Sequence, residues 1–210
     1  DNFIRLDATL ARVEAVRGGS ASTFASDAPG GIVNFVSKTG GTQWGGVARL
    51  TGQPHGLVRG DLNIGGPITE ALRMNVGGFY RHDRGLRDPG FAGNRGGQVR
   101  GTLTGLFDNG HVRLFGKYLN DRTVFYLPVP YENPEDPGSI PGFDLSDGTL
   151  TTDDAARVTV PDPGGQPVTR DLRDGIHPIV KTGGVEFLFD LGRGWTLRNT
   201  TRLTDIDHTF

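Results

Sequence analysis

The chain has 210 residues, a formal net charge of −2, 34 glycines and no cysteine. The small net charge gives no footprint for nucleic acid, and the missing thiols exclude disulfides, thiolate metal sites and cysteine nucleophiles. No apolar run approaches the roughly 20 residues of a membrane-spanning helix, but a barrel strand needs only about 9 to 11 residues with every second one apolar.

Residues 1–11 are too short and too mixed in character to assign to a helix or strand. They lack the charged n-region and the apolar h-region of a signal peptide. Either the protein is not exported or this chain is an internal piece of a longer one.

Residues 12–38 contain two short apolar segments, Val13 to Val16 and Ile32 to Val36, joined by a hinge of small residues at positions 18–22. Apolar residues of the second segment fall on both faces of an extended chain, so we expect this strand to be packed on both sides. Glycine pairs at 30–31 and 40–41 bound the segment as a strand.

The order of residues in this stretch resembles the end of the plug domain in TonB-dependent outer-membrane receptors. It reads Arg-Val-Glu-Ala-Val-Arg-Gly, a turn of small residues, and Gly-Gly-Ile-Val-Asn-Phe-Val-Ser-Lys. The positions that carry this plug motif are Arg17, Gly18, Gly30, Gly31 and Asn34.

From Gln43 onward apolar and polar residues alternate, which predicts strands. The clearest case is 97–107, with Val99, Leu103 and Phe107 on one face. With glycine so frequent and no G-X-Y period, this pattern favours a glycine-rich β-protein. Seven strands are expected, at 43–51, 57–65, 72–80, 97–107, 111–120, 179–190 and 195–203.

The connections between these segments alternate in length. Residues 65–71, 108–110 and 192–194 are short, whereas 81–96 and 122–178 are long, and 53–56 is a short exception. Outer-membrane barrels have short periplasmic turns and longer external loops. Because plugged outer-membrane transporters use 22 strands, seven cannot close such a barrel, and the chain reads as a fragment of one.

We therefore expect an all-β fold: a partial antiparallel transmembrane β-barrel of about seven meander strands, preceded by the C-terminal part of a plug domain. Residues 1–42 are assigned to the plug and 43–210 to the N-terminal part of the barrel. Residues 122–178 form its long external loop. With nine prolines and ten acids against four arginines, this loop is expected to be extended and poorly suited to a core.

The polar faces of the strands are basic instead. They carry Arg49, Arg59, Arg73, Arg100, Arg113, Lys117, Arg198 and Arg202 against the acids Asp61 and Glu186. In a barrel these side chains line the lumen, where a plug or an anionic solute would meet them. The resemblance implies that plug charges pair with the barrel wall. The plug charges are Arg12, Glu14 and Arg17, and the wall acids Asp61 and Glu186 are the candidates to meet Arg17 or Arg12. The alternative is that Glu186 is a hydrated lumen residue.

No enzyme site is expected. The glycines do not form a phosphate-binding G-x-x-x-x-G-K-[ST] loop, and the five histidines have no metal or catalytic spacing. The acids of residues 144–154 lack the spacing of a calcium loop. We therefore predict no catalytic residue, no metal and no cofactor.

The leading functional hypothesis is a receptor in the cell outer membrane. The resemblance implies energy-coupled uptake of an external small-molecule or oligomeric nutrient, such as a ferric siderophore. Its partners would be outer-membrane lipid and the energy-coupling protein TonB, which contacts a segment upstream of residue 1. The alternative is a secreted soluble β-sandwich that acts as a binding or adhesin module, in which a second sheet rather than lipid covers the apolar faces.

Overall fold

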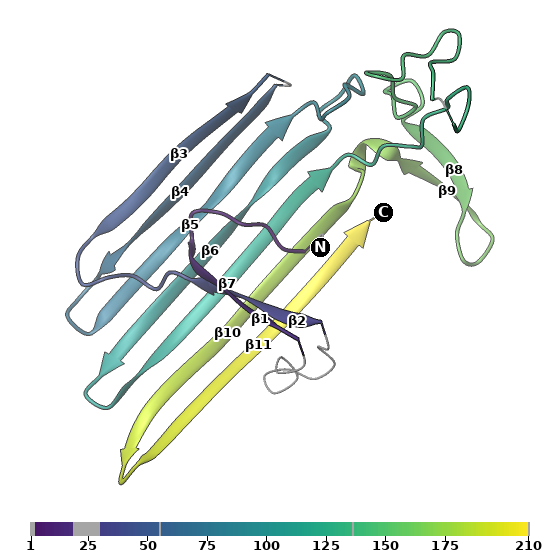
Figure 1. Cartoon of the computed structure of the whole chain (residues 1–210). Helices are drawn as coiled ribbons and strands as arrows, with labels where there is room; N and C mark the ends of the chain where they lie inside the picture. The colour runs from purple at the N-terminus through teal and green to yellow at the C-terminus, as the bar shows by residue number, and fades with distance from the viewer. Residues whose placement is uncertain (1–2, 19–29, 55, 136, 210) are drawn as a thin grey trace.

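The computed structural model describes residues 3–18, 30–54, 56–135 and 137–209. The described residues form three antiparallel sheets: one of seven strands and two of two strands each (Figure 1). No helix in these ranges is long and apolar enough to cross a membrane.

The seven-stranded sheet confirms all seven predicted strands. Its strands are β3 (Gly45–Gln53), β4 (Leu57–Pro67), β5 (Leu72–Asp83), β6 (Asn94–Phe107), β7 (Gly110–Thr123), β10 (His177–Gly192) and β11 (Trp195–Thr209). Each strand pairs with the next of these along the chain, so the sheet is an antiparallel meander. The turns after β4, β6 and β10 lie at one end, and the longer connections lie at the other (Figure 1).

A separate hairpin is formed by β1 (Leu10–Arg17) and β2 (Gly31–Ser37), the two segments predicted from the apolar residues. Arg17 lies opposite Gly31, whose φ is 137°. A Cβ at this position would lie 2.7 Å from the carbonyl oxygen of Val16, so the close approach of the two strands requires glycine here. Of the hinge predicted at residues 18–22, only Gly18 is described, with φ 79°, and the rest lies outside the described residues.

The expectation that the second strand of this hairpin is packed on both sides is not met by the described residues. Val33 is 57% exposed and Val13 of the neighbouring strand is 50% exposed. The two strands form a sheet of their own, and no further strand of the described chain pairs with them to cover these side chains.

Side chains alternate between the two faces of the large sheet, and the strand register sorts them into two sets. The inner face, over which the hairpin lies, carries polar groups such as the buried Gln98. The residues predicted to face lipid share the opposite, outer face; they are Val99, Leu103, Leu114, Val185 and Phe187.

The outer face is apolar and uncovered. Leu50 is 81% exposed and Leu203 is 77% exposed, and no second sheet of the described chain packs over them. A soluble β-sandwich would bury such a face between two sheets. The alternative prediction of a sandwich is therefore wrong, and the exposed apolar surface is that of a barrel wall in lipid.

Aromatic side chains lie near both ends of this outer face. Tyr80 and Tyr118 are exposed toward the end with the long loops, and Phe107 and Trp195 toward the end with the short turns. The ring of Phe107 packs against that of Phe189, with centroids 5.7 Å apart. Two aromatic levels that flank an apolar band are typical of an outer-membrane barrel.

The long connection between β7 and β10 differs from its prediction, because it contains regular structure and a small core. Its strands β8 (Arg157–Pro161) and β9 (Pro167–Asp171) form a hairpin followed by a single 3-10 turn, Leu172–Asp174. Ala156 is 2% exposed and Thr151 is 1% exposed. Two of its nine prolines, Pro161 and Pro167, lie at the ends of these short strands, where proline is tolerated.

Ion pairs hold this connection together at its base. The guanidinium of Arg173 binds Asp171 at 2.6 Å and Asp153 at 3.3 Å, and Arg122 binds Asp174 at 2.9 Å. Hydrogen bonds from Arg173 lower the pKa of Asp171 to about 2, so this carboxylate stays ionised and paired in all but strongly acid solution.

The two faces predict opposite responses to a new charge. In the folded receptor, Leu103→Arg places a cation on the outer face and should lower the free energy of unfolding by roughly 2 to 4 kcal/mol if it lies near the middle of the bilayer. Thr102→Arg, on the inner face, should cost much less. Chemical denaturation in lipid or detergent measures both variants, and equal losses would contradict the assignment of the faces.

Candidate functional site

The inner face of the large sheet is crossed by the N-terminal segment, residues 3–9, before the chain enters β1 (Figure 1). At its start, the ring of Phe3 packs edge-on against His208 of β11, with centroids 5.3 Å apart. Further along the segment, the backbone carbonyl of Leu6 accepts a hydrogen bond from Arg59 of β4. The segment therefore contacts strands from one edge of the sheet to nearly the other.

Basic side chains of the wall bind the backbone carbonyls of this segment. The ammonium of Lys117 donates to the carbonyl of Phe3 at 3.1 Å. The guanidinium of Arg100 donates to the carbonyl of Arg5 at 3.2 Å, and that of Arg59 to the carbonyl of Leu6 at 2.8 Å. An irregular backbone inside a barrel needs such partners, because no ladder satisfies its carbonyl groups.

One buried carboxylate joins the segment to two strands of the wall. Asp121 of β7 is completely buried, and its Oδ2 accepts from Nε of Arg5 at 2.5 Å. Arg81 of β5 donates to both oxygens of the same carboxylate, at 2.9 and 2.8 Å. The described strands thus carry a buried inner-face acid besides the two recognised in the sequence, and it is the one that binds the N-terminal segment.

The residue that follows the β1–β2 hairpin, Lys38, contacts both the end of the N-terminal segment and the inner face of β6. The ammonium of Lys38 donates to the carbonyl of Ala8 at 2.7 Å, and its backbone N–H donates to the carbonyl of Thr9 at 2.8 Å. Thr102 of β6 donates its hydroxyl to the carbonyl of Lys38 at 3.3 Å. The first two bonds close the loop that carries the hairpin, and the third fixes its C-terminal end to the wall.

The two acids predicted to meet the plug are bound within the wall. Asp61 accepts two bonds from Arg59, at 2.6 and 2.8 Å. Glu186 lies directly opposite Arg113 in the register and binds it at 2.6 Å, with His111 at 3.3 Å. Residues two apart on a strand, or opposite each other on neighbouring strands, lie on one face and within reach, so the wall supplies these partners itself.

The predicted plug charges Arg12 and Glu14 bind each other on β1, at 2.7 Å. Asn34, opposite Glu14 on β2, donates to the second oxygen of its carboxylate at 2.9 Å. Hydrogen bonds from Arg12 and Asn34 hold the pKa of Glu14 below its usual value. A contact of Arg17 with the wall stays a prediction, as do the gating roles of Arg12 and Glu14.

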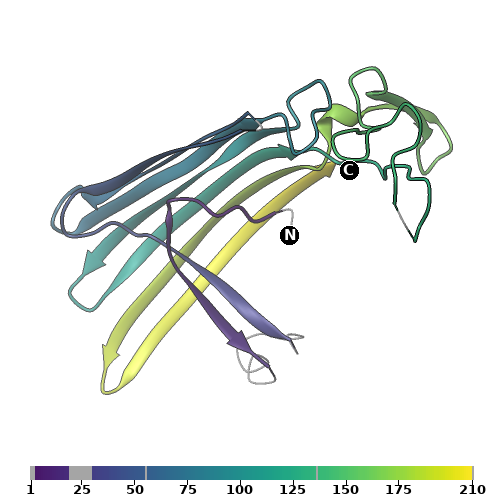
Figure 2. The same cartoon turned by 45° about the horizontal axis from the view of Figure 1, so that its top comes forward.

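A cleft of about 980 Å³ lies between the β1–β2 hairpin and the inner face of β5, β6, β7, β10 and β11. Figure 2 shows the hairpin standing away from the sheet on this side. Arg12 and Glu14 line the cleft from the hairpin, and Glu186 lines it from the wall. The structure thus brings three of the five predicted contact residues to one space without joining the hairpin pair to Glu186.

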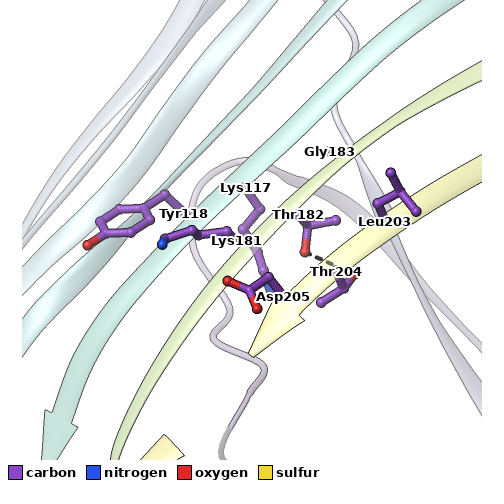
Figure 3. A pocket seen from close by; sticks show the side chains of 8 residues that line it. All are labelled: Lys117, Tyr118, Lys181, Thr182, Gly183, Leu203, Thr204 and Asp205. Atoms are coloured by element: carbon purple, nitrogen blue, oxygen red, sulfur yellow. Dashed lines mark hydrogen bonds between the residues drawn. The ribbon is translucent and has the colours of Figure 1, made fainter. Parts of the chain in front are cut away.

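A smaller hollow of about 480 Å³ lies across β7, β10 and β11 around Gly183 (Figure 3). Thr182 and Thr204 share a hydrogen bond of 3.3 Å on its inner side, while Lys181 and Asp205 lie opposite each other in the register. In the described ranges, no three His, Asp or Glu side chains gather in a group that could hold a metal ion.

Comparison by sequence finds siderophore receptors. The catecholate siderophore receptor Fiu of Escherichia coli O157:H7 is 28% identical over 206 residues, which are 95% of this chain and 25% of Fiu. Fiu of Escherichia coli K12 matches to the same extent. The chain therefore spans about a quarter of the length of the curated relatives it matches. No family model matches it.

Comparison by structure finds the same class of protein. The alcaligin outer-membrane receptor FauA of Bordetella pertussis has a TM-score of 0.58 at 18% identity, over 96% of this chain and 26% of FauA. The siderophore receptor PirA of Pseudomonas aeruginosa has a TM-score of 0.59 at 16% identity, over 96% of this chain and 29% of PirA. The structure of the FpvAI–pyocin S2 complex gives a TM-score of 0.65 at 13% identity, over 94% of this chain and 23% of the matched chain.

The fold is thus part of a plugged outer-membrane β-barrel, with part of a plug on the inner side of the wall strands. The resemblance of residues 12–38 to TonB-dependent outer-membrane receptors is confirmed, and so is the location in the outer membrane of a Gram-negative bacterium. The relatives are receptors rather than enzymes.

Removing the shared carboxylate should destabilise the receptor. Asp121→Ala leaves two partly buried arginines without their acid, so the free energy of unfolding should fall by about 3 to 5 kcal/mol. Arg5→Ala leaves Asp121 bound to Arg81 and should cost about 1 to 3 kcal/mol. Denaturant unfolding of the folded receptor measures both changes.

The matched control for this prediction is Arg84→Ala. Arg84 forms an exposed pair with Asp88 at 3.3 Å, and its loss should change stability by about 0.5 kcal/mol or less. An Asp121→Ala variant as stable as this control would contradict a structural role for the shared carboxylate.

Proposed function

We propose that this chain is part of a receptor that imports an external ligand, such as a ferric siderophore or another nutrient, by TonB-dependent transport. Residues 1–42 are the C-terminal part of the plug, and 43–210 are the N-terminal part of the barrel. One observation carries the proposal: the N-terminal segment crosses the inner face of a wall whose outer face is apolar. Four wall residues bind the segment there, namely Lys117, Arg100, Arg59 and Asp121.

The contacts between the N-terminal segment and the wall suit a plug that must be held and also moved. Three of them join a cation to a neutral carbonyl, and these bonds exchange with water at modest net cost. Asp121 keeps Arg81 as a partner when Arg5 departs, so the wall is not left with an unpaired buried acid. Energy relayed from the inner membrane through TonB would act on a segment upstream of residue 1.

The nature of the ligand is proposed from the relatives. The curated relatives are catecholate siderophore receptors, and the solved neighbours include receptors for alcaligin and enterobactin. The ligand of this receptor would bind on the external loops and on the apex of the plug. The long connection 122–178 belongs to that external surface.

Transport measurements test the function directly. Cells that produce the receptor should bind ferric siderophore whether or not TonB is active, and they should accumulate labelled iron only when TonB is active. The expected difference arises because binding needs only the loops and plug, whereas passage needs the plug to move. Accumulation that persists without TonB would contradict the proposal and indicate an open pore.

The position of residues 122–178 can be tested with protease. Added to intact cells, proteinase K should cut within residues 137–148, which contain no strand or helix, before it cuts the hydrogen-bonded β8–β9 hairpin. The turn at residues 108–109 is the control, and it should be cut only after the outer membrane has been opened. Protection of 137–148 until the membrane is opened would place this connection on the periplasmic side.

A further inference from the structure

The outer face of the large sheet carries a row of basic side chains at the end with the long connections. His82 of β5 lies opposite Arg95 of β6 in the register, and Arg95 lies opposite Arg122 of β7. Neighbouring strands are roughly 4.8 Å apart, so these three residues, the basic row, form one line across the wall. Each of the three strands has a partner strand on both sides, so the basic row lies away from the edges of the sheet.

The neighbours of these residues along each strand show that the basic row faces outward. On the inner face, Arg81 of β5 donates to the hydroxyl of Thr123 of β7 at 2.9 Å. On the same face, Asn94 of β6 donates to the carboxylate of Asp83 of β5 at 2.7 Å. Successive side chains of a strand alternate between the two faces. Each member of the basic row is next to one of these inward residues and therefore points away from the lumen.

The basic row lies at the boundary of the apolar band. Tyr80 is exposed on the same face two residues before His82, roughly 7 Å away. Tyr118 is exposed on the same face of β7, four residues before Arg122. Such aromatic side chains mark the level at which the apolar band of an outer-membrane barrel meets the lipid headgroups. The basic row is thus beside the headgroup layer.

The positive charge of the basic row is only partly compensated. Arg122 binds Asp174 at 2.9 Å. Arg95 is exposed and forms no ion pair with a carboxylate of the described residues. Like charges directly opposite each other destabilise a sheet, so an anion between the two arginines would relieve their repulsion. Arginine binds phosphate through two parallel N–H bonds, which makes a phosphate group well suited to this place.

A hollow of about 720 Å³ borders the basic row at His82. It lies between the turn that joins β3 to β4 and the connection that follows β5, and its lining includes Arg84 and the exposed Leu86. The acids in its lining are Asp88, which binds Arg84 at 3.3 Å, and Asp147. The charges of this hollow are therefore nearly balanced, and it offers room beside the basic row for the uncharged part of a headgroup.

We propose that the basic row is a binding site for a phosphate-bearing lipid of the outer leaflet. The acyl chains of the lipid would pack on the apolar band of β5, β6 and β7, and its phosphate groups would bind Arg95 and Arg122. The ligand is a lipid because the basic row is continuous with the face that lies in lipid. Arginine stems cover apolar surface there while their charged heads reach the headgroup layer.

This site lies on the outside of the wall, away from the path of the imported ligand, and so goes beyond the proposed function. It uses the external position of the long connections, which the protease experiment tests separately.

Lipid binding to the complete receptor tests the site. The purified and delipidated receptor in detergent is titrated with bisphosphorylated lipid A, and the bound lipid is counted by native mass spectrometry. Dephosphorylated lipid A with the same acyl chains is the matched probe. We expect the phosphorylated lipid to bind at least tenfold more tightly, because only this lipid carries the anionic oxygens that the arginines bind.

Charge-neutral variants then test the residues. Arg95→Gln with Arg122→Gln should weaken binding of the phosphorylated lipid about 20-fold, at about fivefold for each arginine near a charged lipid surface. Binding of the dephosphorylated lipid should not change. The control with the same change of net charge is Arg157→Gln with Arg170→Gln on the β8–β9 hairpin, which should bind both lipids as the unchanged receptor does. If the first variant does not fold, Arg95→Gln alone leaves the pair of Arg122 and Asp174 intact and should weaken binding about fivefold.

Three results would overturn the inference. The first is equal affinity of the receptor for the two lipids, and the second is a loss of affinity no larger in the variants of the basic row than in the control. The third is displacement of the lipid by inorganic phosphate at an equal molar concentration, which would indicate a site for soluble phosphate. None of these measurements involves TonB or uptake, so the site and the proposed function can fail separately.

Discussion

The structure depends on one constraint, that backbone polar groups in a membrane environment must find partners within the protein. The meander satisfies this constraint for the wall, because each strand pairs with its neighbour along the chain. The N-terminal segment has no ladder, and its carbonyls accept from Arg59, Arg100 and Lys117 instead. Long basic side chains on the inner face are thus explained first as donors for an irregular backbone.

This use of cations accounts for the charge balance of the inner face. Three inner-face acids each have a wall arginine beside them: Arg59 with Asp61, Arg113 with Glu186, and Arg81 with Asp121. The cations that bind carbonyls need no acid, so positive charge accumulates wherever the segment and hairpin are fixed. Part of the positive charge of the inner face is therefore a consequence of how the plug is held.

The strands could be predicted from the sequence because lipid imposes a strict alternation on each of them, and the register then places Leu103, Leu114 and Val185 in one row. The ion-pair partners on the inner face could not be predicted, because they depend on the strand register and on where each strand ends. Arg81 and Asp121 each lie one residue beyond a predicted strand, at 72–80 and 111–120. The shared carboxylate was therefore missed.

The other omissions also have physical causes. Residues 3–9 show no period, since their path is set by donors on distant strands rather than by a pattern of their own. The β8 and β9 strands are five residues each and include prolines, so alternation had too few positions to be recognised. Both segments take their structure from contacts that are remote in the sequence.

The acidic composition of the external connection does not oppose a basic lumen, because many of its acids are engaged locally. Asp171 and Asp153 bind Arg173, and Asp174 binds Arg122. Asp144 and Asp162 accept from backbone N–H groups of their own turns. Charges that are paired or hydrogen-bonded in a solvated loop are screened within about 8 Å at physiological ionic strength.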